Sequence, residues 1–366
     1  MVIQQIIDYL ESIAPSSYQE NYDNAGLITG LAGWECTGAL ICLDTTEAVV
    51  TEAIQKNCNL VIAHHPIIFS GLKKINGKNY VEQTVITAIK NDIAIYAIHT
   101  NLDNVQHGVN GKIADRLGLV NCSVLQPKTG TLKKLFTFVP LAQAELVRSA
   151  IFMAGGGAVG NYSECSFNVE GEGSFKAGEE TNPYVGEIGR RHTEKEIKLE
   201  VIFPAYLENK IVKAMIGAHP YEEVAYDIIQ LNNNHPSLGA GIIGDLTEPV
   251  DETVFLRLLK DRFKVPVIKH TLLTGKQVKR IACCGGAGSF LIVNALTKGA
   301  DFFITSDLKY HEFFDANNRL VIADIGHYES EQFTIDLLYE ILKGKFSSFA
   351  LLKTEVNTNP VNYFID

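Results

Sequence analysis

The chain alternates short apolar runs with segments whose apolar residues recur every three or four positions. Runs rich in β-branched residues predict buried strands, and the three-to-four spacing predicts helices. Strands are predicted at 39–43, 59–63, 93–98, 279–284, 302–305 and 320–324. Helices are predicted from residue 3 onward, over 46–56, 81–91 and 252–261, from the end of the 285–289 loop to residue 296, and from 326 to about 342. Strands alternating with helices of this length are typical of an α/β fold with a parallel or mixed sheet.

A different pattern occupies the middle of the chain. Strands are predicted at 133–139, 163–169, 197–203 and 224–231, helices at 142–154 and 206–216, and a loose Gly- and Glu-rich run at 170–189. The order β-α-β-β-α-β is typical of a ferredoxin-like domain. We therefore expect one α/β core domain, residues 1–126 and 237–366, interrupted by a ferredoxin-like α+β insert, residues 127–236.

Composition narrows the class of protein. None of the apolar runs in the 366 residues approaches the roughly 20 residues needed to span a bilayer. The first residues lack a basic start followed by an apolar core, so no secretory signal is expected and the predicted location is cytoplasmic. The seven cysteines include no C-x-x-C pair, which argues against a disulfide framework. A formal net charge of −10 argues against a nucleic-acid partner.

Candidate metal ligands follow three of the predicted strands. His64 and His65 end the strand 59–63, because Pro66 cannot continue a sheet ladder. Neutral imidazole is a common metal ligand, although two unrelated histidines capping a strand would look the same. Asp103 follows the strand 93–98, with His99 four residues earlier. Sites in open α/β sheets form outside the carboxyl ends of strands, which is where these residues fall.

The third candidate pair is His327 and Glu331. If a helix begins after Gly326, the i, i+4 spacing places both side chains on one helix face, as it would for an ordinary surface pair. Three imidazoles and two carboxylates suit two divalent ions about 3.5–4 Å apart, with coordination positions left open for water or substrate. Nitrogen and oxygen ligands without thiolate favour Zn, Fe or Mn over Ca.

Other segments carry weaker signals. The loop Gly285–Ser289 lies between a strand and a helix, where it could hold a phosphate or form a tight packing turn. Residues 306–312 follow another strand, and His311 or Glu312 there are candidate proton carriers, or the segment simply begins a helix. His99 is a candidate for supporting a metal ligand, for shuttling protons or for simple packing. Residues 219–223 are expected to fix a turn or a subunit contact.

These segments together resemble a known family. The resemblance covers nearly the whole chain and rests on six motifs: Tyr22–Leu27, Ala63–Pro66, His99–Asp103, Gly285–Ser289, Thr305–Asp307 and Gly326–Glu331. The chain resembles the Nif-three-like family of dinuclear-metal hexameric proteins, commonly named GTP cyclohydrolase 1 type 2 homologs. The family more often has Trp and Val where Tyr22 and Ala25 stand, and neither position is a ligand.

The resemblance implies a ligand set and an assembly. His64, His65, Asp103, His327 and Glu331 match the family's metal ligands, with Glu331 as the bridging carboxylate. It implies two divalent ions per chain, zinc first and iron or manganese as alternatives. It also implies a ring-shaped homohexamer, a trimer of dimers. Residues 218–227 resemble the CutA/PII-like insert of the longer bacterial members.

Two functions follow from this interpretation. The first is a metal-dependent hydrolase, GTP cyclohydrolase-like or phosphoesterase-like, with a metal-bridging hydroxide as nucleophile and a nucleotide or phosphorylated small molecule as substrate. Its candidate catalytic residues are Glu331, His99 and His311. The alternative is a non-enzymatic, metal-responsive regulatory or scaffold ring whose insert senses a ligand. Family analogy alone does not establish a reaction.

Overall fold

The computed structural model describes residues 1–364, and their contacts divide the chain into two compact units. One unit holds residues 1–127 together with the chain from residue 237 on, and the other holds residues 128–236. The mixed α/β class predicted from the sequence is confirmed. Within the described residues, no helix is both long and apolar enough to cross a membrane.

The first sheet of the larger unit is built on short buried strands. Its order is β1 (Gly26–Thr29), β4 (Ala94–Ala97), β3 (Leu60–Ala63), β2 (Ala39–Cys42) and β15 (Leu351–Lys353). The strands β2, β3 and β4 run parallel, and all of their residues are buried. Their carboxyl ends therefore lie at one edge of the sheet.

Helices cover both faces of this sheet. They are α1 (Ile3–Ile13), α2 (Glu47–Gln55), α3 (Tyr80–Lys90) and α11 (Thr334–Lys345). Alternate strand residues separate two cores, because neighbours on a strand point to opposite faces. Leu40, Val61 and Ile95 pack with α2 and α3, whereas Ile41 and Ile62 pack with α1 and α11.

The second sheet supplies another row of parallel strand ends. Its order is β11 (Lys269–His270), β14 (Val321–Asp324), β13 (Phe302–Ser306), β12 (Gln277–Ala287), β10 (Gly239–Asp251) and β5 (Val120–Pro127). The strands β12, β13 and β14 are parallel. Further helices are α4 (Thr100–Asp103), α5 (Val109–Leu117), α8 (Glu252–Phe263), α9 (Ile292–Thr297) and α10 (His327–Glu331). One core cluster contains residues of both sheets, such as Ile62 and Ile304, so the two sheets form one folded unit.

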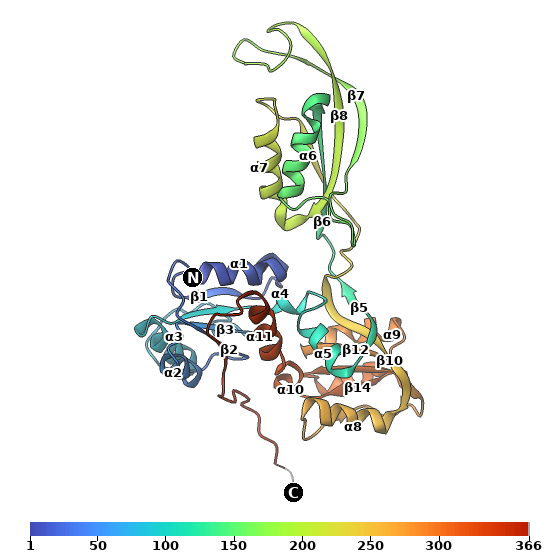
Figure 1. Cartoon of the computed structure of the whole chain (residues 1–366). Helices are drawn as coiled ribbons and strands as arrows, with labels where there is room; N and C mark the ends of the chain where they lie inside the picture. The colour runs from blue at the N-terminus through green and yellow to red at the C-terminus, as the bar shows by residue number, and fades with distance from the viewer. Residues whose placement is uncertain (365–366) are drawn as a thin grey trace. The chain divides into compact units, whose positions relative to one another are not determined.

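The smaller unit has the predicted β-α-β-β-α-β order. Its elements are β6 (Leu132–Pro140), α6 (Ala144–Met153), β7 (Phe167–Lys176), β8 (Arg191–Pro204), α7 (Glu208–Ala218) and β9 (Tyr226–Gln230). The sheet order β7-β8-β6-β9 is antiparallel throughout. Figure 1 shows α6 and α7 side by side on one face of this sheet, where they pack on Leu199, Val201 and Phe203.

Several boundaries differ from the sequence predictions. The strand predicted at 163–169 begins at Phe167 and continues through the supposed loose run to Lys176, because its Gly and Glu residues pair with β8. The helix predicted from 326 to 342 is two helices, α10 and α11. The strands β1, β5, β10, β11 and β15 have no counterpart among the predicted strands. Short 3-10 turns add η1 (Ser16–Tyr18), η2 (Leu141–Gln143), η3 (Ala205–Leu207), η4 (Ser289–Leu291) and η5 (Tyr310–Ala316).

Candidate metal centre

Strand ends of both sheets in the larger unit meet at one cluster of side chains. His64 and His65 follow β3, Asp103 ends α4 just after β4, and His327 and Glu331 lie on α10 just after β14. Groups drawn from these residues could hold a metal ion. We call His64, His65, Asp103, His327 and Glu331 the five-residue cluster.

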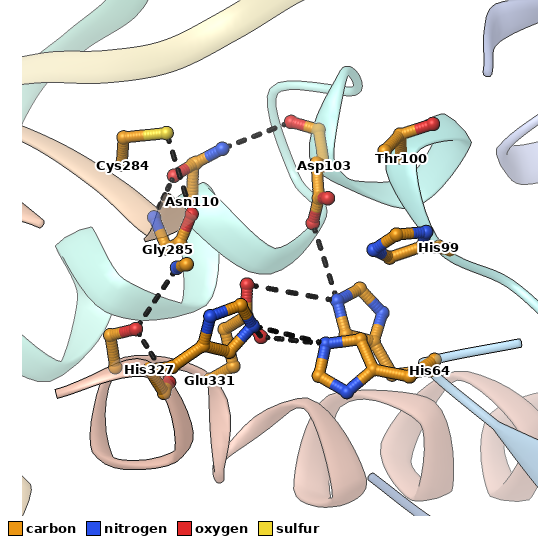
Figure 2. A network of polar contacts seen from close by, with 12 residues as sticks. His64, His99, Thr100, Asp103, Asn110, Cys284, Gly285, His327 and Glu331 are labelled. Atoms are coloured by element: carbon orange, nitrogen blue, oxygen red, sulfur yellow. Dashed lines mark hydrogen bonds and ion pairs between the residues drawn. The ribbon is translucent and has the colours of Figure 1, made fainter. Parts of the chain in front are cut away.

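Glu331 lies at the middle of the cluster and is only 3% exposed. Its Oε2 lies 3.0 Å from His65 Nε2 and 3.1 Å from His327 Nε2. Its Oε1 faces the other way, 3.9 Å from His64 Nε2, which is 3.6 Å from Asp103 Oδ1. Figure 2 shows the carboxylate between the rings of His327 and His64. Each carboxylate oxygen therefore faces a different group of candidate ligand atoms.

The donor atoms fit a metal ion. Within the described residues, His64 Nε2 and Asp103 Oδ1 are buried and have no hydrogen-bond partner. A buried polar atom left unpaired costs free energy, so native structures rarely keep one without a reason. Nitrogen and carboxylate oxygen donors suit Zn, Fe or Mn. An ion between these two atoms would satisfy both of them.

The Nδ1 atom of each of the three imidazoles lies within hydrogen-bond distance of an acceptor oxygen. His64 Nδ1 lies 2.8 Å from the Ile98 carbonyl, and His65 Nδ1 lies 2.7 Å from Asp44 Oδ1. His327 Nδ1 lies 2.5 Å from Asp307 Oδ2. An acceptor at Nδ1 fixes the ring orientation and the tautomer, which leaves Nε2 as the ligand atom.

His99 lies beside the cluster on the side of His64 and His65. Its ring centroid is 5.2 Å from that of His64 and 5.3 Å from that of His65. Its Nδ1 lies 2.7 Å from Asp23 Oδ1. Burial raises the pKa of Asp23, but hydrogen bonds from His99 and Thr100 outweigh burial and lower it to about 2. Asp23 is therefore an ionised acceptor at neutral pH.

The cluster holds an unusual charge pattern when no metal is bound. Burial lowers the pKa of His65, but hydrogen bonds to Asp44 and Glu331 outweigh burial and raise it to about 10. Burial likewise lowers the pKa of His327, and Glu331 and Asp307 raise it to about 9. Burial, with the charge of Glu331, raises the pKa of Asp103 to about 7. Burial raises the pKa of Glu331, yet the imidazoles around it hold that pKa well below its usual range.

The loop Gly285–Ser289 lies beside the cluster, and two of its backbone amides are not available to bind a phosphate. Gly285 N donates to Asn110 Oδ1 at 3.0 Å, and Gly286 N donates to Ser330 Oγ at 3.0 Å. Both amides therefore bond to protein groups, which favours a packing turn at these two positions. Gly286 also has a φ of 62°, a left-handed conformation that favours glycine.

Gly286→Ala is expected to damage the cluster through one methyl group. A Cβ at Gly286 would lie 2.5 Å from Glu331 Oε1, so the carboxylate would have to move. We expect Zn²⁺ affinity to fall about 10-fold or more, as measured by titration against a competing chelator. Gly299→Ala is the matched control, because Gly299 has a φ of 70° and a Cβ there would meet no heavy atom within 4 Å. Both variants share a left-handed backbone cost of about 1 kcal/mol. Equal affinities in the two variants would contradict the prediction.

A cavity of about 590 Å³ opens directly beside the cluster. Its lining includes His65, His327, Asp307, Lys269 and Tyr363. Cavities of roughly 300–1,000 Å³ hold small-molecule ligands. A ligand in this space would contact two of the imidazoles on the side where Asp44 and Asp307 lie.

His311, which the sequence made a candidate catalytic residue, does not join the cluster. His311 is exposed on η5, and its ring contacts Tyr310 and Phe314. Among the described residues, the metal-competent groups do not include it. The sequence reasoning also gave no role to Asp44, Asp307 and Asp23. Asp44 and Asp307 follow β2 and β13, so the strand-end rule that pointed to the histidines applies to them as well.

Comparisons with known proteins identify the family of this chain. The family model described as Duf34/NIF3 (NGG1p interacting factor 3) matches residues 1–360. The chain belongs to the Duf34/NIF3 family. A Halalkalibacterium halodurans relative of this family, named GTP cyclohydrolase 1 type 2 homolog, is 39% identical over 365 residues, covering 98% of both chains. A Bacillus subtilis relative of the same name is 37% identical over 365 residues, again covering 98% of both.

Solved Duf34/NIF3 structures have the same fold. A Bacillus cereus protein related to NIF3 matches with a TM-score of 0.85 and 38% identity, covering 100% of this chain and 99% of that one. The Staphylococcus aureus protein SA1388 matches with a TM-score of 0.79 and 28% identity, with the same coverage. The resemblance stated from the motifs is thus confirmed at the level of the family.

Proposed function

We propose that this Duf34/NIF3 protein is a metal-dependent hydrolase that holds two divalent ions per chain, with zinc first and iron or manganese as alternatives. The observation that carries the proposal is that His64 Nε2 and Asp103 Oδ1, both buried beside the carboxylate of Glu331, make no hydrogen bond within the described residues and lie 3.6 Å apart. His65 and His327 would complete the other ligand group. Divalent ions in such a site act as Lewis acids and lower the pKa of bound water.

The chain's own residues have distinct roles in this proposal. Glu331 holds the two ligand groups together. His99 is the proposed proton carrier, because ionised Asp23 accepts its Nδ1–H and so orients a ring that lies beside those of His64 and His65. The neighbouring cavity would bind the substrate. We propose a nucleotide or phosphorylated small molecule, since relatives are named GTP cyclohydrolase 1 type 2 homolog. His311 stays a candidate from the sequence alone.

The proposed assembly is the homohexamer implied by the resemblance, a trimer of dimers, and the insert is proposed to be CutA/PII-like. The alternative function is a metal-responsive regulatory or scaffold ring. It shares the metal centre and differs in having no turnover.

A turnover screen distinguishes the two functions. The zinc- or manganese-loaded chain is assayed with GTP and with p-nitrophenyl phosphate, and chelator-treated protein is the blank. We expect metal-dependent hydrolysis of one class. We expect His99→Gln to keep its metal and to lose about 100-fold or more in turnover. His107→Gln, which changes an exposed imidazole, is the matched control. Metal binding without turnover of any nucleotide or phosphoester would favour the regulatory ring.

A further inference from the structure

The insert contains a cavity that the metal chemistry does not use. Its volume is about 640 Å³, and all of its lining residues belong to the smaller unit. Glu196 and Lys198 of β8 line it, whereas Leu199, Val201 and Phe203 of the same strand pack under α6 and α7. Alternating residues point to opposite faces of a sheet, so the cavity lies on the face away from the helices.

Four aromatic residues line the cavity, Phe138 of β6 among them, and the rings of the other three lie close together. These three are Phe175 of β7, Tyr184 of the β7–β8 connection and Tyr221 of the segment after α7. The ring centroids of Phe175 and Tyr221 are 6.0 Å apart, and those of Tyr184 and Tyr221 are 6.3 Å apart. Three separate segments of the insert therefore bring their rings to one place.

The β7–β8 connection is tied down over the cavity. Asn182 N donates to Glu222 Oε1 at 2.8 Å, which joins the connection to the segment after α7. Gln143 Nε2 donates to the Tyr184 hydroxyl at 2.9 Å. These two hydrogen bonds hold the ring of Tyr184 near that of Tyr221.

A buried carboxylate lies among the rings. Glu196 is 8% exposed, and its Oε1 accepts a hydrogen bond from the Tyr221 hydroxyl at 2.8 Å. A side chain at Gly173 would overlap Glu196 Oε2, so the absence of a Cβ there makes room for the carboxylate. A charge in this position is costly unless it is paired, and one neutral hydroxyl compensates it only in part.

The charge of the lining excludes one class of ligand and favours another. Glu196, Glu222 and Glu223 supply the acidic side chains of the lining, whereas the side chains of Glu170 and Glu172 point to the other face of the sheet, because Gly171 lies directly opposite Glu196. The basic lining residues in the described chain are Lys176 and Lys198, and Lys198 forms an ion pair with Glu200 at 3.0 Å. Like charges would repel a nucleotide or another polyanion.

We propose that this cavity binds an organic ammonium ligand. The positive group would lie against Glu196, enclosed by the rings of Phe175, Tyr184 and Tyr221. Aromatic faces attract cations, and cages of such rings recognise alkylated ammonium groups. The cavity has room for an organic body attached to that group. This site goes beyond the proposed hydrolase function and requires neither metal nor turnover.

The test uses the full chain and benzyltrimethylammonium as the probe, with binding measured by isothermal titration calorimetry. We expect saturable binding of this cation and no binding of neutral benzyl alcohol or of ATP at the same concentrations. Glu196→Gln keeps the shape and an acceptor for Tyr221 but removes the charge, so affinity should fall about 10-fold or more. Glu187→Gln is the control, because Glu187 is exposed and ion-paired with Arg190 at 3.6 Å.

A second variant keeps the proposal testable if Glu196→Gln misfolds. A Cβ at Gly171 would meet no heavy atom within 4 Å, so Gly171→Leu places a side chain in the open space of the cavity. It should abolish binding of the cation. The proposal is overturned if the wild type shows no binding up to about 10 mM, if Glu196→Gln binds equally well, or if ATP is preferred to the cation. Metal content measured on the same samples separates this result from the fate of the hydrolase proposal.

Discussion

Glu331→Gln is expected to empty the metal centre while the chain stays folded. The substitution keeps the size of the side chain but removes the carboxylate charge that His64, His65 and His327 share. It also places an amide NH₂ where an ion or an imidazole needs an acceptor. Metal affinity should fall about 100-fold or more, and elemental analysis should give about two ions per wild-type chain and fewer than one in the variant.

The matched control for this experiment is Glu340→Gln. Glu340 is another helical glutamate, 60% exposed at its side chain and ion-paired with Lys112 at 2.7 Å. Exposed pairs contribute little to stability, so this variant should bind metal as the wild type does. Two tightly held ions in purified Glu331→Gln would refute the bridging role. An unchanged circular dichroism spectrum is needed to attribute the loss to the site.

Metal affinity is expected to rise steeply with pH. A metal ligand must give up its proton, and in the metal-free chain the pKa of His65 is raised to about 10 and that of His327 to about 9, in both cases by hydrogen bonds that outweigh burial. Both rings are therefore protonated at pH 7, and binding must release about two protons. Between pH 6 and pH 8, Zn²⁺ affinity should increase about 100-fold or more per pH unit, measurable by chelator competition, since Asp103, whose pKa burial raises to about 7, adds to the protons released at the lower end of the range.

The metal-free chain should respond to pH in the opposite direction. A histidine whose pKa is higher in the folded state stabilises the fold below the unfolded value of 6.5, and this contribution is lost as the pH rises towards 9 and 10. The midpoint of thermal unfolding should thus fall with rising pH in chelated protein and rise in metal-loaded protein. If the unfolding midpoint changed in the same direction with pH in both samples, the idea that protons and metal compete for these histidines would be contradicted.

The five-residue cluster could be predicted from the sequence because its members stand at predictable places. The strands β3 and β14 are continuous apolar runs, and the residues that follow them fall at a sheet edge regardless of the exact fold. The i, i+4 spacing of His327 and Glu331 also depends only on local helix geometry. These local signals needed no knowledge of which strands are neighbours.

The supporting residues could not be predicted in the same way. The contact of His99 with Asp23 spans 76 residues, and that of His65 with Asp44 spans 21. For a carboxylate near a strand end, no sequence pattern indicates which residue will be its hydrogen-bond partner. The strand β10 was missed because its glycines and acidic residues lower its β-propensity, whereas pairing with β5 and β12 makes it central in the sheet. Likewise the sequence of β7 contains two glycines and two glutamates, and it is pairing with β8 that makes this segment a strand.

Because β5 pairs with β10, the sheet of the larger unit does not depend on the insert between these two strands. Pro127 and Gly239, on either side of the insert, are directly opposed in an antiparallel register. A short turn is all that is needed to join two antiparallel neighbours. The surrounding sheet would keep its register with the insert present, shortened or replaced. A lineage could therefore gain or lose the whole insert by a single recombination between these two positions, and the five-residue cluster, which lies entirely in the other unit, would be inherited unchanged.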